Sequence, residues 1–388
     1  MKTTIGIIGG GPAGLLLSYL LDRMGVDNCV LEHRSRAHVE NRVRAGQMDH
    51  SSVAFLRGVG LGARMDKEGM PQRGVNLRYR DETRRIDLED VTGGRYCTVY
   101  GQSELTRDLI AALVGSGHSP IFNAENIQLS DPDTTPHAIN FMLDGSQLRL
   151  ECQYLVGADG AHGPTRQVVL GTSPGDAKQL PFSWIGVLSQ TPPISDELTY
   201  VYHPGGFALW SMRSKSVSRT YLQCSASDRL EDWSDDRFWT EMRCRLGPET
   251  DFNPGPTTER VLVRMQGYVA SRMRRGNVVL AGDAGHIVPP SAAKGLNLAI
   301  ADVAHLATAF RKLLFGNDQN ALSEYGDGAM RRAWAGQHFS WQMTDLFHAA
   351  PDGDAFENNL KLTQLDSLLG SSERLRLFCD AYVGAEAL

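Results

Sequence analysis

Three glycines near the start of the chain, Gly9, Gly11 and Gly14, have the spacing of a loop that binds the phosphates of a dinucleotide. The first permits a tight turn, the second lets the backbone approach a pyrophosphate, and the third allows a helix to pack closely on a strand. Glu32 stands at the end of the next predicted strand, where a carboxylate accepts hydrogen bonds from a ribose. The pattern predicts a dinucleotide site, but it does not separate NAD from FAD.

A second group of polar residues lies on two predicted strands that flank a turn at residues 214–218. Side chains alternate between the two faces of a strand, so Ser211 and Arg213 share one face, as do Arg219 and Tyr221. This turn would place Arg213 opposite Arg219 and Ser211 opposite Tyr221. Because opposed arginines repel each other, the pattern favours a bound anion such as a substrate carboxylate. An exposed polar sheet face would explain the same pattern.

Two kinds of element are needed to position these residues. An apolar strand at 5–8, a helix after the glycines and a strand at 29–31 form a βαβ unit that opens a parallel sheet. Longer strands follow between residues 182 and 224, and the sequence is helical from Gly295 onward. We predict an α/β fold with a Rossmann-like domain, a mostly β substrate domain and a helical C-terminal region. The predicted boundaries are 1–175 for the first domain, with a hairpin at 74–96 reaching towards the substrate sheet, 176–268 for the second, and 269–388 for the return to the first domain and the helices.

The composition argues against several classes of protein. The net charge of the 388-residue chain is −6, from 39 lysines and arginines against 45 aspartates and glutamates, so we expect no nucleic-acid partner. No apolar run is long enough to span a membrane, and the N-terminus lacks the layout of a signal peptide. The six cysteines are scattered without metal-site spacing, so we expect no metal and a reducing, cytoplasmic location.

Two further segments, Asp159-Gly160 and Gly282-Asp283, each follow a short apolar strand. Together with the glycine loop, they resemble the paired signatures of the flavoprotein aromatic hydroxylases. Other segments carry the resemblance along essentially the whole chain: Arg42-Val43-Arg44-Ala45-Gly46, Val99-Tyr100-Gly101-Gln102, Trp233-Ser234-Asp235, the runs 282–290 and 293–299, and Tyr382-Val383-Gly384. The family implies that the first domain binds FAD and that NADPH or NADH is the co-substrate.

The resemblance also implies which residues hold the flavin. Asp283 would bind the ribityl chain, and the helix that opens at Gly295, Leu296 and Asn297 would direct its positive end at the flavin ring. The other contacts to FAD are expected from Gly9, Gly11, Gly14, Glu32, Arg42, Arg44, Gln102, Asp159 and Arg219. Basic residues suit the nicotinamide co-substrate, although a solvated cationic loop explains them equally well: Arg34, His38, Arg42 and His162.

For the substrate, the resemblance makes Ser211, Arg213 and Tyr221 the receptor of a carboxylate. At the opposite end, Tyr200 and Tyr382 would pass the proton of a phenol towards solvent. The Pro290 carbonyl would contact the same hydroxyl, and the ring would be walled by Trp184, Leu198 and Leu209.

The reaction implied is hydroxylation of 4-hydroxybenzoate ortho to its hydroxyl, giving 3,4-dihydroxybenzoate at the expense of NAD(P)H and O2. Two alternatives remain open at this stage. One is a related hydroxylase of 4-aminobenzoate or 3,4-dihydroxybenzoate. The other is a flavin-binding aromatic-acid protein that does not hydroxylate. The family also suggests a homodimer.

Several positions depart from the family pattern, among them Asp49, Ser291 and Ala292, and two of the departures bear on proton release and on the co-substrate. Gln72 stands where the family has a histidine at the solvent end of the proton path, and a glutamine does not titrate near neutrality. We therefore expect the last step of proton release to depend on water. Gln266 replaces an arginine associated with NADPH, which leaves the preference between NADPH and NADH open.

Overall fold

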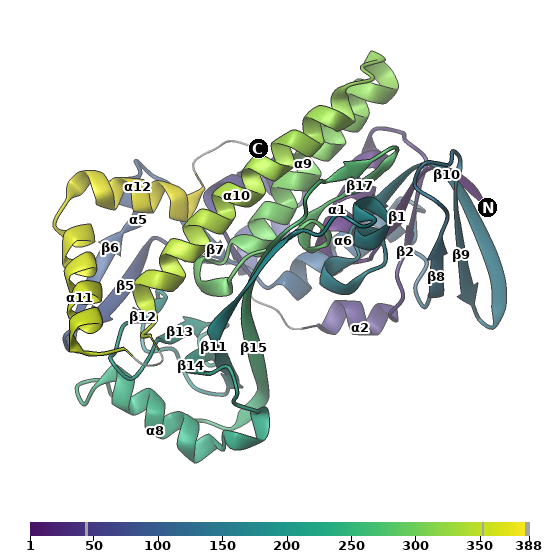
Figure 1. Cartoon of the computed structure of the whole chain (residues 1–388). Helices are drawn as coiled ribbons and strands as arrows, with labels where there is room; N and C mark the ends of the chain where they lie inside the picture. Colours follow the sequence, from purple (N-terminus) through teal and green to yellow (C-terminus); the bar gives the residue numbers. More distant parts are fainter. Residues whose placement is uncertain (43–45, 351–352, 385–388) are drawn as a thin grey trace.

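The computed structural model describes residues 1–42, 46–350 and 353–384, which form three β-sheets and the helices around them (Figure 1). The first sheet has seven strands, five of them in the order β16-β17-β10-β1-β2. Four neighbouring strands of it run parallel: β1 (Lys2–Ile8), β2 (Asn28–Leu31), β10 (Ser146–Gly157) and β17 (Val278–Leu280). The antiparallel strands are β16 (Arg274–Arg275), β9 (His137–Leu143) and β8 (Glu125–Leu129).

Helix α1 (Pro12–Arg23) joins β1 to β2 and packs against α6 (Gln102–Gly115) and α9 (Lys294–Gly316). Its side chains from Leu15 to Leu17 are buried, and they share one hydrophobic cluster with Ile5 and Ile7 of β1. A nearly all-apolar helix is explained by this position, because it is covered by the sheet on one side and by helices on the other. The predicted βαβ unit is confirmed.

The described residues also form a small three-stranded sheet and several short helices. The sheet has the order β3-β7-β4, with β3 (Gln47–Met48), β7 (Cys97–Val99) and β4 (Met70–Gln72) all antiparallel to their neighbours. The short helices are α2 (Arg36–Asn41), α3 (His50–Gly58), α4 (Ala63–Glu68), α5 (Leu88–Val91) and α7 (Thr165–Leu170).

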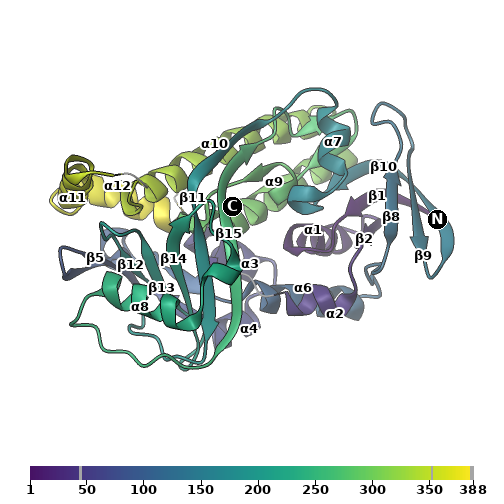
Figure 2. The same ribbon diagram turned by 60° about the horizontal axis from the view of Figure 1, so that its bottom comes forward.

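The third sheet has eight strands in the order β18-β15-β11-β14-β13-β12-β5-β6. Its long strands β11 (Asp176–Ser189) and β15 (Thr257–Val269) connect the part of the molecule that holds β1 with the part that holds α8 (Asp235–Leu246), as Figures 1 and 2 show. The other strands are β5 (Gly74–Tyr79), β6 (Glu82–Asp87), β12 (Thr199–Val201), β13 (Ala208–Met212), β14 (Ser218–Ser225) and β18 (His286–Ile287). The hairpin β5–β6 joins this sheet through the parallel pairing of β5 with β12.

The two faces of the eight-stranded sheet belong to different hydrophobic clusters. Trp210 lies on the face covered by α8, where it contacts Trp239 and Phe252. Trp184 and Tyr200 lie on the opposite face, in a cluster that also includes residues from the C-terminal helices α10 (Ala321–Phe347), α11 (Ala355–Leu369) and α12 (Ser372–Val383). This second face carries the residues expected to touch a substrate.

The predicted fold class is confirmed, but the predicted register of the β13–β14 hairpin is wrong by two residues. Arg219 pairs with Ser211 rather than with Arg213, and Tyr221 pairs with Leu209 rather than with Ser211. The reason is a tighter turn: the N–H of Arg213 donates to the carbonyl of Val217 over 2.8 Å, so the loop between them is shorter than expected. A shift by two keeps all four side chains on one face, but it separates the two arginines along the strands.

Candidate active site

The glycine loop leaves room where a dinucleotide would need it. Gly9 has a φ of 110°, and a Cβ there would lie 2.2 Å from the carbonyl oxygen of Ala158. A Cβ on Gly14 would lie 1.9 Å from the Gly9 oxygen, so only glycine lets α1 approach the loop this closely. Nothing lies within 4 Å of the corresponding position on Gly11. The loop is therefore closely packed at its ends and open at its centre, as a pyrophosphate requires.

Glu32 is fixed beside this loop at the end of β2. One carboxylate oxygen accepts a hydrogen bond from the N–H of Gly10 over 2.6 Å, and the other accepts from the N–H of Arg34 over 2.7 Å. His33 lies 3.0 Å from the second oxygen. Although Glu32 is buried, the oxygen that accepts from Gly10 has a further lone pair, so the carboxylate can still accept a ribose hydroxyl.

The Gly282-Asp283 turn is held from behind by a buried group of charges. Asp302 accepts a hydrogen bond from the N–H of Gly282 over 3.1 Å and lies 2.7 Å from His286 Nε2 and 3.3 Å from Arg332. Burial alone lowers the pKa of His286, but the adjacent Asp302 carboxylate outweighs this effect and raises that pKa above its ordinary value. Asp283 is partly exposed, and its carboxylate has no hydrogen-bonding partner among the residues described. It is thus available to a ligand.

The start of α9 also faces open space. Ala293 precedes the helix in the left-handed conformation, with a φ of 52°, and nothing lies within 4 Å of a Cβ placed on Gly295. The Asn297 side chain donates to the carbonyls of Ala293 and Gln47 and accepts from the N–H of Asp49 over 3.0 Å. Asn297 therefore ties β3 to the helix, and the unpaired N–H groups of the helix start remain available to an anion.

One carboxylate oxygen of Asp159 is hydrogen-bonded and the other is not. Its Oδ2 accepts from the N–H and the hydroxyl of Thr165, at 2.9 and 2.7 Å, whereas its Oδ1 is buried without a partner. Burial raises the pKa of this carboxyl. Nearby, Arg166 donates to the carbonyls of Asp283 and Ala284 and stacks on Tyr268, with its guanidinium carbon 4.0 Å from the ring centre. A hollow of about 430 Å³ opens beside Arg166, and the exposed His162 forms part of its lining.

The β13–β14 hairpin places cationic and hydroxyl groups on the sheet face described above. Arg219 is buried; one of its nitrogens lies 3.1 Å from Glu259, and its Nη1 has no partner. The Ser211 hydroxyl donates to the Arg219 carbonyl over 2.9 Å. Burial, together with the charge on Arg219, lowers the pKa of Arg213. An anion beside these guanidinium groups would offset the repulsion between them.

Glycine again fixes an aromatic side chain on this face. Tyr221 pairs across the sheet with Gly186, and a Cβ on Gly186 would lie only 2.6 Å from the tyrosine ring. The Tyr221 ring therefore lies over bare backbone, with its centre 5.1 Å from that of Trp184. Burial raises the pKa of the Tyr221 hydroxyl, so it stays a neutral donor.

Trp184 is held by a histidine that stays neutral. Its indole N–H donates to Nε2 of His348 over 2.6 Å, and Nδ1 of His348 lies 2.7 Å from the Thr344 carbonyl, to which it donates. Burial lowers the pKa of His348 to about 3, so the ring can accept from the indole throughout the neutral range. Leu198 and Leu209 belong to the same buried cluster. The structure thus brings together all three residues expected to wall the substrate ring.

Tyr200 and Tyr382 meet in the same cluster, with their hydroxyl oxygens 3.2 Å apart. Tyr200 also donates to the carbonyl of Ser291 over 3.1 Å. This contact involves Ser291 rather than Pro290, whose carbonyl accepts from the N–H of Ala293. Burial raises the pKa values of both tyrosines, so both are neutral donors at physiological pH.

Among the described residues, Gln72 forms no hydrogen bond to either tyrosine. Its amide nitrogen donates to the Asp196 carbonyl and to the Met212 sulfur, each at 2.9 Å, and its oxygen accepts from the N–H of Leu198 over 3.0 Å. Instead, Gln47 donates to the Tyr382 hydroxyl over 2.9 Å. Sequence reasoning did not single out Gln47, because its strand is two residues long and too short to show alternation.

The structure brings only some of the remaining residues expected to bind FAD or NAD(P)H close to one another. Gln102 is the first residue of α6, and Leu296 lies in the first turn of α9. Arg34, His38 and Arg42 are exposed on or beside α2, and no contact among the residues described joins His162 to Arg34 or His38. Arg44 lies outside the described residues.

Comparisons with known proteins identify the family. A family model described as an FAD binding domain matches residues 2–340. The chain is 38% identical to the p-hydroxybenzoate hydroxylase of Acinetobacter baylyi, over 99% of this chain and 96% of that protein. The chain belongs to the p-hydroxybenzoate hydroxylase family. This hydroxylase is therefore an FAD-dependent aromatic monooxygenase, with NAD(P)H as its co-substrate.

More distant relatives agree with this assignment. The 3-(3-hydroxy-phenyl)propionate/3-hydroxycinnamic acid hydroxylase of Mycobacterium sp. strain JLS is 24% identical to this chain. The match covers 85% of this chain and 57% of the mycobacterial protein. The crystal structure of p-nitrophenol 4-monooxygenase from Pseudomonas putida superposes with a TM-score of 0.84 at 19% identity, over 99% of both chains, and shows the same fold.

The residues present fit FAD. The open space at Gly11 and at Gly295 lies at two N–H-rich loops, and Asp159 Oδ1 and Arg219 Nη1 are buried polar atoms that lack a partner. Within residues 1–42, 46–350 and 353–384, no helix is long and apolar enough to cross a membrane, and no group of three or more His, Cys, Asp or Glu residues could hold a metal ion.

The different surroundings of Gly11 and Gly14 lead to a testable prediction. Gly14→Ala would drive a Cβ into the Gly9 carbonyl, so the purified variant should lose its flavin absorbance and melt at a lower temperature than the parent. Gly11→Ala has open space and should keep the fold of the parent while binding FAD more weakly. Melting curves of the apoproteins and FAD titrations separate the two effects. Equal melting temperatures for both apo variants would contradict this account of the loop.

Proposed function

We propose that this enzyme hydroxylates 4-hydroxybenzoate at the carbon ortho to its hydroxyl and releases 3,4-dihydroxybenzoate. One observation carries the proposal: a cationic hairpin and a pair of hydrogen-bonded tyrosines occur on the same face of the eight-stranded sheet. Such a face recognises a benzoate carboxylate at one end and a phenol at the other. The name of the Acinetobacter baylyi relative supports the same substrate.

At the carboxylate end, we assign binding to Arg213, Ser211 and Tyr221. A guanidinium binds a carboxylate through two parallel N–H donors, which fixes the orientation of the ring as well as its position. The hydroxyl of Tyr221 is kept protonated by burial and adds a neutral donor. Trp184, Leu198 and Leu209 then provide the apolar walls, so the ring is held between fixed surfaces.

At the phenol end, we assign the contact with the substrate hydroxyl to Tyr200, whose own hydroxyl lies 3.2 Å from that of Tyr382. Ionisation of the phenol activates its ortho carbon, and a fixed donor to the phenolate oxygen favours the ionised form. The Pro290 carbonyl has a second lone pair and can accept from the same hydroxyl while it is protonated. When bound, FAD would accept electrons from NAD(P)H and use them to activate O2.

For the cofactors, we assign FAD to the loop of Gly9, Gly11 and Gly14, and to Glu32, Arg42, Arg44, Gln102, Asp159, Arg219, Asp283, Gly295, Leu296 and Asn297. The hollow beside Arg166 is open and partly cationic, which suits the phosphates of NAD(P)H near His162. Arg34, His38 and Arg42 would contribute from the side of α2. The enzyme would work in the cytoplasm, where NAD(P)H is supplied.

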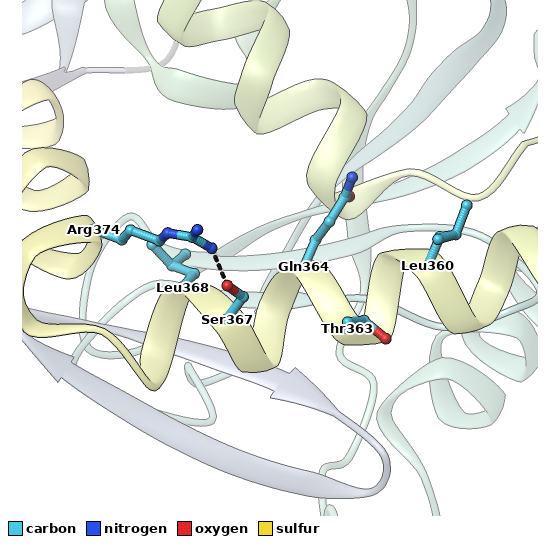
Figure 3. A pocket seen from close by; sticks show the side chains of 6 residues that line it. All are labelled: Leu360, Thr363, Gln364, Ser367, Leu368 and Arg374. Atoms are coloured by element: carbon cyan, nitrogen blue, oxygen red, sulfur yellow. Dashed lines mark hydrogen bonds between the residues drawn. The ribbon is translucent and has the colours of Figure 1, made fainter.

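We also propose that two copies of the chain form a dimer through α11 and α12. Phe356 and Leu360 on α11 and Leu377 on α12 are exposed, at 70%, 49% and 64%. A hollow of about 300 Å³ lies along α11. Its lining includes Leu360 and Leu368 of α11 and Arg374 of α12, which are labelled in Figure 3. Exposed apolar side chains next to a hollow are typical of a surface that a second copy covers.

The reaction is tested by giving the FAD-loaded enzyme NADPH, NADH and a panel of benzoates. Hydroxylation of 4-hydroxybenzoate to 3,4-dihydroxybenzoate, with one product molecule per NAD(P)H oxidised, is the expected result. A preference for 4-aminobenzoate or for 3,4-dihydroxybenzoate would reassign the substrate. Oxidation of NAD(P)H that yields only peroxide with every benzoate would show that the protein does not hydroxylate.

Arg213→Ala tests the carboxylate end. Removing one partner of a buried charge pair should weaken 4-hydroxybenzoate binding by roughly 2–5 kcal/mol, while the FAD content stays at the parental level. Lys215→Ala, in the exposed loop of the same hairpin, is the matched control and should bind the substrate like the parent. Dissociation constants from flavin absorbance changes decide the outcome. Equal affinities in both variants would remove Arg213 from the site.

Tyr200→Phe tests the phenol end. The variant keeps the ring but deletes the donor, so NAD(P)H should still be oxidised while more of the O2 consumed appears as peroxide. Tyr202→Phe is the control, since Tyr202 lies two residues along the chain and its hydroxyl donates to Asn358 over 2.8 Å. Product formed per NAD(P)H oxidised is the measurement. A fully coupled Tyr200→Phe enzyme would rule out the assigned role.

Phe356→Asp tests the dimer. A charge on the apolar face should turn a dimer into a monomer at micromolar concentration, as measured by sedimentation velocity. Phe315→Asp places the same charge on an equally exposed phenylalanine of α9, at 64% exposure, and should leave the dimer intact. A parent protein that sediments as a monomer refutes the dimer itself, and a Phe356→Asp dimer moves the interface elsewhere.

A further inference from the structure

The donors and acceptors around Tyr382 form a chain with only one consistent direction. The Gln47 amide nitrogen can only donate, so the Tyr382 oxygen accepts from it. At the other end, the Ser291 carbonyl can only accept, so Tyr200 donates to it. Each tyrosine has a single hydroxyl proton, and the proton of Tyr382 is therefore the one shared with Tyr200. The order of donation is Gln47 to Tyr382 to Tyr200 to Ser291.

This direction determines which form of a bound phenol is favoured. If the Tyr200 hydroxyl turns from the Ser291 carbonyl to a substrate oxygen, every donor in the chain points towards the substrate. That arrangement stabilises a phenolate, which only accepts hydrogen bonds. In the opposite arrangement, a neutral phenol would donate to Tyr200 and Tyr200 would donate to Tyr382. The Tyr382 oxygen would then accept from both Tyr200 and Gln47, and its own proton would have no acceptor among the hydrogen bonds of the described residues.

We propose that Gln47 is a positioning residue whose amide N–H fixes both tyrosine hydroxyls as donors towards the substrate oxygen, and so favours the ionised phenol. The inference rests on the proposed function, because it needs a phenolic substrate at Tyr200. The amide neither gains nor loses a proton, and the proton released on ionisation goes to the buffer. Gln47 would act on the substrate oxygen through Tyr382 and Tyr200.

The charged and titratable groups around this series of hydrogen bonds come from several elements. Lys294 of α9 donates to the Tyr382 carbonyl over 3.0 Å and pairs with Asp49 over 3.2 Å. Cys97 of β7 lies 3.7 Å from the same carbonyl, and burial raises the pKa of its thiol to about 12, so it stays neutral. On α12 itself, Asp380 pairs with Arg95. These groups are present in every variant of residue 47, but the Gln47 side chain also lies beside the Cys97 thiol, so the comparison between Gln47→Met and Gln47→Glu includes the effect of a charge near Lys294 and Asp49.

Gln47→Met and Gln47→Glu test the proposal in the FAD-loaded enzyme. Both side chains are close to glutamine in size, but methionine cannot donate and an ionised glutamate can only accept. Gln337→Met is the matched control, because Gln337 is also buried and forms no hydrogen bond to the residues described. The readout is the phenolate absorbance of bound 4-hydroxybenzoate as a function of pH, at saturating substrate.

We expect the midpoint of this titration to rise by roughly 0.5–1 pH unit in Gln47→Met, the equivalent of one ordinary hydrogen bond. The midpoint should rise further in Gln47→Glu, whose charge also repels the phenolate, and stay at the parental value in Gln337→Met. FAD content should not change in any of the three. A parent that titrates normally with unshifted midpoints in both Gln47 variants overturns this inference alone. A parent that shows no 4-hydroxybenzoate binding overturns the proposed function, and this inference with it.

Discussion

Side chains alternate between the two faces along β11, so Trp184 and Ile185, which are neighbours in the sequence, belong to two different hydrophobic clusters. The same alternation in β12, β13 and β14 sends Tyr200, Leu209 and Tyr221 to the Trp184 face. Because the opposite face is fully occupied by α8 and its aromatic contacts, no strand can slip by one residue without exposing large apolar side chains. The substrate face is thus defined by the packing of the face behind it.

This constraint explains which parts of the site were predictable from sequence. The glycine loop and the βαβ unit follow from local spacing. The shared face of Ser211, Arg213 and Tyr221 follows from the alternation of side chains along each strand. The cross-strand partners did not follow, because they depend on the length of the turn, and the contact between Arg213 and Val217 makes that turn tighter than expected. A register shift of two residues leaves every side chain on the same face of the sheet. The predicted face was therefore right, although the predicted cross-strand pairs were wrong.

Residues on very short elements were beyond sequence reasoning. Gln47 lies on a strand of two residues, and its partner Tyr382 comes from the last helix described. For Gln72 the sequence suggested a role that the structure does not support. Its place in the family pattern suggested a proton path, yet its amide is hydrogen-bonded to backbone groups and to the Met212 sulfur. In both cases the decisive information is which side chain occupies a given donor or acceptor, and neither periodicity nor charge encodes this.

The contact between Gln47 and Tyr382 spans 335 residues, and the one between Tyr200 and Tyr382 spans 182. Contacts this far apart in sequence close very large loops, and the entropic cost of closing a loop grows with its length. The dinucleotide loop, by contrast, lies within the first 32 residues. The hydrogen-bonded hydroxyl groups therefore exist only when α12 is docked against the rest of the molecule, whereas the glycine loop includes no residue of α12.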